Sequence, residues 1–189
     1  MRVPAMGRVI RIVLAAVVLV VLISLALPWL ENALYAMRLS SMPAPTALPI
    51  PVLGLTRKSL TDTWHASRPP RRRHEGIDIF AKKGTPVISN TEGIVLRRGE
   101  NSLGGNVVWV LGPGGLRHYY AHLDQFADVT AGKRVDVGSV LGYVGNTGNA
   151  RTTPPHLHYG VYATTGAINP YPLLAAMRPK TDKDSKARE

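Results

Sequence analysis

The sequence predicts an all-β fold, a compact antiparallel sheet domain, preceded by one transmembrane helix. Short β-branched and aromatic runs recur between residues 85 and 163, and turn-forming residues separate them. An uncharged apolar run near the amino terminus predicts the helix. The 189 residues include 18 glycines and 15 prolines, which is typical of a domain with many turns. We therefore expect one β domain with appendages.

The apolar run Ile12–Leu30 contains no charged residue. As a helix rising ~1.5 Å per residue it would extend roughly 28 Å, close to the thickness of the hydrocarbon core. Arg2, Arg8 and Arg11 precede it, so the positive-inside rule places the amino terminus in the cytoplasm and the following chain outside. A cleaved signal peptide is the alternative, because residues 24–26 resemble a cleavage site. We favour a retained single-pass anchor in the inner membrane, since the run continues past that point.

The expected organisation has four parts. Residues 1–30 are a cytoplasmic stub and transmembrane anchor, and residues 31–56 are a proline-rich linker. Residues 57–177 are the folded domain, and residues 178–189 are a charged, disordered tail. The linker composition suits an extended, semi-rigid stalk between membrane and domain.

Six runs in the domain are expected to form strands. They are TPVIS (85–89), GIVLRR (93–98), NVVWVLG (106–112), LRHYYAHL (116–123), VLGYVG (140–145) and HLHYGVY (156–162). The glycine-rich turn at 113–115 predicts a hairpin between the third and fourth runs. No stretch of the domain has helical periodicity over three turns.

Charge and cysteine content narrow the possible functions. The formal net charge is +11, but no nucleic-acid-binding motif accompanies it and aromatic residues are not interleaved with the basic ones. We therefore expect no nucleic-acid partner. The absence of cysteine excludes disulfides, thiolate nucleophiles and cysteine-type zinc sites.

Two segments place ligand-type residues at suggestive spacings. In PPHLHYG, His156 and His158 share one face of a strand, with Cα atoms about 6.6 Å apart, so both can reach one cavity. In HEGIDIF, His74 and Asp78 would lie about 13 Å apart on a straight strand. A bend at Gly76 would bring them together, and glycine permits such a bend.

The strand LRHYYAHL contributes further histidines. By regular alternation, His118, Tyr120 and His122 are expected on one face. Three histidine-bearing segments and one carboxylate suit a zinc site with nitrogen and oxygen ligands. A catalytic zinc uses three protein ligands and one open position, which leaves histidines for acid–base work. Residue types alone do not decide which histidine does which.

HEGID, YYAHLD and GNTGNARTTPPHLHYGVY together, in this order, resemble the three signature blocks of the lysostaphin/LytM-type zinc endopeptidases. The resemblance covers about residues 62–174. It implies a small β-sheet domain with a groove, one zinc ion per chain, and hydrolysis of peptide cross-links in bacterial peptidoglycan. A single anchor and short stalk favour a periplasmic setting.

Carried over block by block, the resemblance assigns roles to five residues. His74, Asp78 and His158 match the family's zinc ligands, and His122 and His156 match its catalytic histidines. Which catalytic histidine is the general base stays open, as does the bond that is cleaved. The alternative is an inert LytM-like domain that binds and activates another cell-wall hydrolase. Because inert relatives typically lose metal ligands, the five matching positions favour an enzyme.

Other polar residues receive structural interpretations. We expect His118 at the groove rim rather than in contact with substrate, and Tyr120 in packing rather than as an oxyanion donor. We expect His65 in solvent, and Asp62 in a turn rather than as a hydrogen-bond acceptor for a ligand histidine. The arginines at 71–73 are expected in a solvated loop, where they could attract carboxylates of peptidoglycan stems.

Overall fold

The computed structural model describes residues 4–68 and 71–176, so the predicted tail 178–189 lies outside the described residues. The chain divides into two units, Met1–Met37 and Arg38–Glu189, which are described separately. The helices are α1 Pro4–Ser41 and α2 Tyr171–Ala176, with short 3-10 turns η1 Arg57–Ser59, η2 Pro113–Gly115 and η3 Gly148–Ala150. The strands are β1 Ser67–Arg68, β2 Arg72–Arg73, β3 Ile77–Phe80, β4 Pro86–Ile88, β5 Gly93–Asn101, β6 Gly105–Leu111, β7 Arg117–Phe126, β8 Arg134–Val135, β9 Val140–Val144, β10 His156–Ala163 and β11 Gly166–Ile168.

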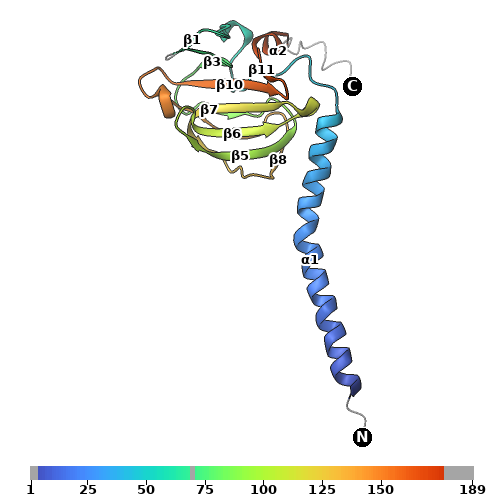
Figure 1. Cartoon of the computed structure of the whole chain (residues 1–189). Helices are drawn as coiled ribbons and strands as arrows, with labels where there is room; N and C mark the ends of the chain where they lie inside the picture. The colour runs from blue at the N-terminus through green and yellow to red at the C-terminus, as the bar shows by residue number, and fades with distance from the viewer. Residues whose placement is uncertain (1–3, 69–70, 177–189) are drawn as a thin grey trace, which may run out of the picture. The chain divides into compact units, whose positions relative to one another are not determined.

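Helix α1 contains the apolar run predicted to be helical (Figure 1). Its large apolar side chains between residues 9 and 30 are exposed, from 49% at Val21 to 81% at Trp29, and its most apolar window has no buried residue. A helix that is apolar on all sides requires apolar surroundings. Within the described residues, α1 is the one helix long and apolar enough to cross a membrane, although a signal sequence has the same properties.

The second unit is mostly antiparallel β-sheet, as the sequence predicts. Nine strands between residues 77 and 168 join in one sheet, in which β11, β10, β7, β6, β5 and β8 follow one another (Figure 1). Strand β3 pairs with β10, while β9 pairs with both β4 and β7. The expected hairpin at 113–115 connects β6 and β7, with Gly114 and Gly115 at positive φ.

Alternation along β6, β7 and β10 separates two faces of the sheet. Val108, Tyr120 and Tyr159 lie in the main core. Their sequence neighbours Val107 and Tyr119 belong to a smaller cluster on the opposite face. Tyr119 of this smaller cluster lines the groove described below, together with Trp109 and Tyr162 that pack against the cluster.

Residues 31–56 differ from the extended linker expected from their composition. Helix α1 continues to Ser41, and Leu48 and Val52 are buried in the main core. The Leu48 N–H donates to Leu173 O at 2.9 Å, and Val52 forms a bridge with Val87. Proline prevents regular secondary structure here, but the apolar side chains between the prolines still gain free energy by burial.

Candidate metal centre

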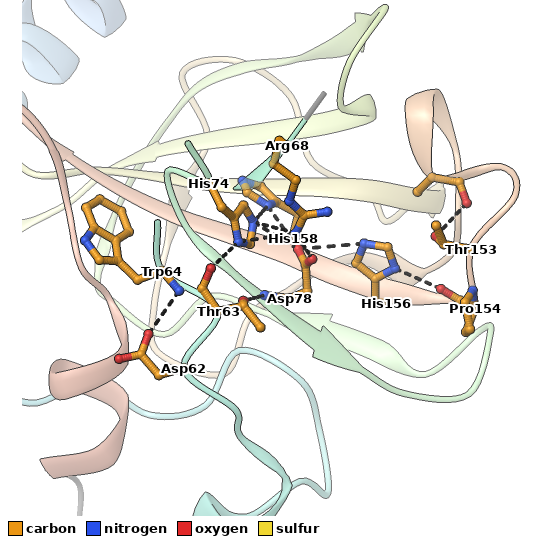
Figure 2. Close-up of polar contacts among 11 residues, drawn as sticks. Asp62, Thr63, Trp64, Arg68, His74, Asp78, Thr153, Pro154, His156 and His158 are labelled. Atoms are coloured by element: carbon orange, nitrogen blue, oxygen red, sulfur yellow. Dashed lines mark hydrogen bonds and ion pairs between the residues drawn. The ribbon is translucent and has the colours of Figure 1, made fainter. Parts of the chain in front are cut away.

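Three predicted ligands converge at one end of β3 and β10 (Figure 2). His158 lies directly opposite Asp78 in the register of these strands, so both side chains stand next to each other. His74 Nε2 lies 2.8 Å from His158 Nδ1 and 3.1 Å from Asp78 Oδ1. His158 Nδ1 lies 3.2 Å from the same carboxylate oxygen.

The spacing of these three atoms fits a zinc ion. Ligand atoms bound about 2.0–2.1 Å from one tetrahedral zinc lie roughly 3.3 Å from one another. The observed separations of 2.8, 3.1 and 3.2 Å are close to that value. Two imidazoles and one carboxylate are also a donor set that zinc prefers. The cluster can therefore hold a metal ion.

The predicted bend at Gly76 is present between His74 and β3. A Cβ atom at Gly76 would lie 2.6 Å from Tyr159 O and 2.8 Å from Cε1 of His158. Any larger residue would push this segment away from β10. Glycine is therefore required here by a close backbone approach, and that approach carries His74 to Asp78.

Backbone carbonyls orient three of the histidines. His74 Nδ1 lies 2.8 Å from Thr63 O, His122 Nδ1 lies 2.9 Å from Thr147 O, and His156 Nδ1 lies 2.8 Å from Pro154 O. Because a carbonyl oxygen can only accept a hydrogen bond, each Nδ1 must carry the proton. In the neutral ring, Nε2 is then left as an acceptor for a metal or a proton.

His122 and His156 stand beside the three-donor cluster. Their rings are 4.9 Å apart, and the His122 ring is 5.9 Å from that of His158. His156 Nε2 lies 3.8 Å from Asp78 Oδ1. The structure thus brings together all five residues that the sequence singles out. His156 and His158 reach the same site, as expected for alternate residues of one strand.

The site is electrostatically asymmetric. Burial by itself would raise the pKa of the Asp78 carboxyl, but the adjacent imidazoles of His158 and His74 outweigh burial and hold that pKa well below its usual range. Burial also lowers the pKa of His158, and it lowers the pKa of His122 to about 4. Asp78 is therefore ionised and His122 is neutral at pH 7.

Arg68 on β1 contacts this cluster from the side. Its guanidinium donates to Asp78 Oδ2 and lies 3.3 Å from both ring nitrogens of His74. The two oxygens of Asp78 therefore face different partners, with Oδ2 on Arg68 and Oδ1 on the histidines. The Arg68 side chain is 38% exposed and also lines the groove.

The cluster opens into a groove of about 650 Å³. One wall is aromatic: Trp109 packs on Tyr119 at 4.4 Å and on Tyr162 at 5.3 Å between ring centroids. The groove also has a positively charged part, because Arg72 and Arg73 line it. The remaining lining residues include Glu75, residues 101–104 and Asn149. An extended peptide with polar and anionic groups suits such a groove.

The expectation that His118, Tyr120 and His122 share a face is wrong. Val108 pairs with Tyr120 and Asn106 with Leu123, so β7 holds one residue more than β6 in this interval. This bulge, with His122 at φ 63°, turns the His122 side chain to the groove face. His118 is instead fully buried in the core, not at the groove rim, and Tyr120 is buried there with it.

The structural interpretations of Asp62 and His65 are confirmed. Asp62 does act in a turn, since its Oδ1 accepts the Trp64 N–H at 3.0 Å. His65 is exposed and stacks on Trp64. Sequence reasoning missed Thr63 and Arg68, and it missed the carbonyls of Thr147 and Pro154. A backbone carbonyl is the same in every residue, so it leaves no signal in the sequence.

Comparison with known proteins relates the chain to a family of peptidases. The profile of Peptidase family M23 matches residues 72–170, which include all five residues of the site. An L-Ala–D-Glu endopeptidase of Bacillus subtilis is 40% identical over 142 residues, covering 69% of this chain and 43% of that protein. The DD-carboxypeptidase/endopeptidase Mpg of Neisseria meningitidis is 35% identical over 116 residues, covering 61% of this chain and 26% of that protein. The chain thus spans less than half the length of these curated relatives.

Solved structures share the fold. A crystal structure of an M23 peptidase from Pseudomonas aeruginosa matches with a TM-score of 0.58 at 31% identity, covering 78% of this chain and 59% of that chain.

Proposed function

Because the chain belongs to peptidase family M23, we propose that it is a zinc-dependent endopeptidase that hydrolyses peptide cross-links of bacterial peptidoglycan. One observation carries the proposal. A three-donor cluster of His74, Asp78 and His158 opens into a groove, and two further histidines stand next to it. The names of the relatives, an L-Ala–D-Glu endopeptidase and a DD-carboxypeptidase/endopeptidase, support a peptide that contains D-amino acids as the target.

In this proposal the three donors hold one zinc ion per chain. His74 would bind through Nε2, Asp78 through Oδ1 and His158 through Nδ1, the atoms that face one another. When bound, zinc would polarise the scissile carbonyl and lower the pKa of the attacking water. Because Arg68 binds Oδ2, Asp78 would coordinate the metal through one oxygen only, Oδ1.

His122 and His156 would exchange protons with the reacting groups. Each has Nδ1 held by a carbonyl and Nε2 free to accept, so a neutral ring can take a proton from the attacking water. Once protonated, the same ring can stabilise the oxyanion or donate to the leaving amine. Their 4.9 Å ring separation would allow both to reach one scissile bond.

The direct test is digestion of purified peptidoglycan by the full chain in detergent, with products identified by mass spectrometry. We expect cross-linked muropeptides to be cut, and we expect a metal chelator to stop the reaction. Products cut between L-Ala and D-Glu would move the target bond from the cross-link to the stem peptide. No turnover by the zinc-loaded protein would contradict the proposal and favour an inert domain that activates another hydrolase.

The location of the protein is part of the same proposal. Residues 1–30 would anchor it in the inner membrane, with residues 31–189 on the periplasmic side. Protease added to spheroplasts should digest the domain, and the mature protein should begin near Met1. A mature amino terminus just after Ala26 would instead identify α1 as a cleaved signal sequence.

A further inference from the structure

Thr63 contacts two of the proposed zinc ligands through two different atoms (Figure 2). Its backbone oxygen accepts a hydrogen bond from His74 Nδ1 at 2.8 Å. Its side-chain Oγ1 accepts the Asp78 backbone N–H at 3.0 Å. Thr63 lies before residues 72–170, the stretch that matches the family profile.

A hydrogen-bonded turn holds Thr63 in place. Asp62 Oδ1 accepts the Trp64 N–H at 3.0 Å, and Thr63 O accepts the Ala66 N–H at 3.2 Å. His65 completes the turn with a left-handed backbone at φ 59°. Asn169 Nδ2 donates to Asp62 Oδ2 at 3.4 Å, which ties the turn to the carboxyl-terminal part of the domain.

The same turn also clamps the backbone of His74. The His65 N–H donates to His74 O at 2.9 Å, and the His74 N–H donates to Ala66 O at 3.0 Å. With the bond from its ring to Thr63 O, three hydrogen bonds fix the position, orientation and tautomer of this ligand.

Asp78 depends on Thr63 in a different way. Within the described residues, β3 pairs with β10 alone, so its other edge lacks a strand partner. On this strand, the Asp78 N–H finds its acceptor in the Thr63 hydroxyl. Asp78 is buried, so losing that acceptor would leave a backbone donor poorly satisfied directly beside the carboxylate.

We propose that Thr63 is a positioning residue that sets the geometry of His74 and Asp78 for zinc. This inference rests on the proposed function, because it requires these residues to be zinc ligands. Loss of one outer hydrogen-bond partner of a metal ligand typically weakens metal binding about 10–100-fold. The Thr63 hydroxyl is one of two contacts, so the lower end of that range applies.

The test compares Thr63→Val with Thr63→Ser in the full chain in detergent. Valine keeps the shape and the backbone carbonyl but removes the hydroxyl, whereas serine keeps the hydroxyl. Zinc affinity is measured by competition with a chelator, and ligand geometry by the visible spectrum of the cobalt-substituted protein. We expect Thr63→Val to bind zinc about tenfold more weakly and to change the cobalt spectrum, and Thr63→Ser to stay close to the unsubstituted protein.

Three results would overturn the inference. One is unchanged zinc affinity in Thr63→Val, and a second is an equal loss in Thr63→Ser, because serine keeps the hydroxyl and the effect would then not depend on it. The third comes from the pair Asp62→Ala and Asp62→Asn, which remains informative if Thr63→Val does not fold. Alanine removes the acceptor that holds the turn and asparagine retains it, so equal zinc affinities would contradict the mechanism. Failure of the unsubstituted chain to bind zinc would refute the proposed function itself.

Discussion

Strands β7 and β10 each carry polar residues on both faces of the sheet. Those on one face line the groove, and those on the other face are buried in the core. On the groove face, His122 and His158 stand with Asp78 and open into the groove. On the core face, His118 and Tyr159 come from the same two strands, only four residues and one residue away. The comparison shows how the same residue types become either a reactive site or part of the packing.

The polar core cluster consists of Asn90, His118, Tyr120 and Tyr159, which bond mainly to one another. Tyr120 Oη donates to Asn90 Oδ1 at 2.7 Å, Asn90 Nδ2 donates to Tyr159 Oη at 2.9 Å, and His118 Nδ1 lies 2.7 Å from Tyr159 Oη. Asn90 Nδ2 also donates to Pro49 O at 3.1 Å, so the cluster holds the segment before residue 56. Burial lowers the pKa of His118 to about 4 and raises the pKa of both tyrosines. The whole cluster is neutral at pH 7.

Two features therefore distinguish the groove face. It contains an ionised carboxylate, and its acceptor nitrogens face one another across a gap the size of a metal ion. The core cluster combines neutral groups that satisfy each other, apart from His118 Nε2, which has no hydrogen-bond partner within the described residues. The role of a histidine in this domain thus depends on which face of the sheet it lies on. Substitutions on the groove face should change zinc binding or activity, and substitutions on the core face should change stability.

The largest effect is expected from removing a proposed ligand. Asp78→Asn or His158→Ala leaves two strong zinc ligands. Zinc affinity should therefore fall by more than the ~10–100-fold that is typical when a ligand loses an outer hydrogen-bond partner. Activity should drop to that of the chelator-treated protein. Zinc content and peptidoglycan turnover are measured together, with folding checked by circular dichroism. The matched control is His118→Gln on the core face, which should keep its zinc, and loss of metal from that variant would contradict the comparison.

A smaller effect is expected from His122 and His156. His156→Ala and His122→Ala should retain zinc but lose on the order of 10²–10⁴ in kcat, the usual contribution of acid–base catalysis. The measurement is turnover of a defined muropeptide at saturating substrate, alongside zinc analysis. If His156→Ala loses zinc and His158→Ala retains it, the roles of the two histidines are reversed.

The core face should respond to pH. The pKa of His118 is about 4 in the folded protein against 6.5 as its ordinary value, so the unfolded chain binds the proton more readily between these values. Stability should therefore fall as pH decreases from about 6.5 to about 4, with His118 contributing about 2–3 kcal/mol to that loss. Denaturant unfolding at pH 7 and pH 4.5 should show a smaller pH dependence in His118→Gln. An unchanged pH dependence would show that His118 is not a buried neutral histidine.

Part of the fold and of the site could be predicted from the sequence. The strand runs, the hairpin at 113–115, the bend at Gly76 and the shared face of His156 and His158 are properties of local pattern, and all are present. The opposite faces of His118 and His122 were not predictable, because an unmarked bulge in β7 breaks the alternation.

Tertiary contacts account for the other differences. The composition of residues 31–56 predicts a free stalk, but Leu48 and Val52 pack into a core that local sequence does not reveal. Arg68 and Thr63 reach the site because the chain folds back on itself before β3. Such partners are invisible to spacing rules.

The smallest effect is expected at the basic side of the groove. Arg73→Gln removes an exposed positive charge that lines the groove, and stem peptides carry carboxylates. We expect KM to rise a few-fold for a carboxylate-bearing muropeptide, less so at high salt, with kcat nearly unchanged. Arg57→Gln makes the same charge change outside the groove lining and should have no effect. Equal KM values for the two variants would rule out a substrate contact at Arg73.

The central claim is that zinc binds on the groove face through one histidine of the HxH pair and not through the other. An anomalous difference map at the zinc edge, from crystals of the zinc-loaded protein, tests this most directly. We expect one peak within about 2.0–2.2 Å of His74 Nε2, Asp78 Oδ1 and His158 Nδ1, with His122 and His156 beyond bonding distance. A peak bonded to His156 instead of His158, or a peak at His118 on the core face, would contradict it.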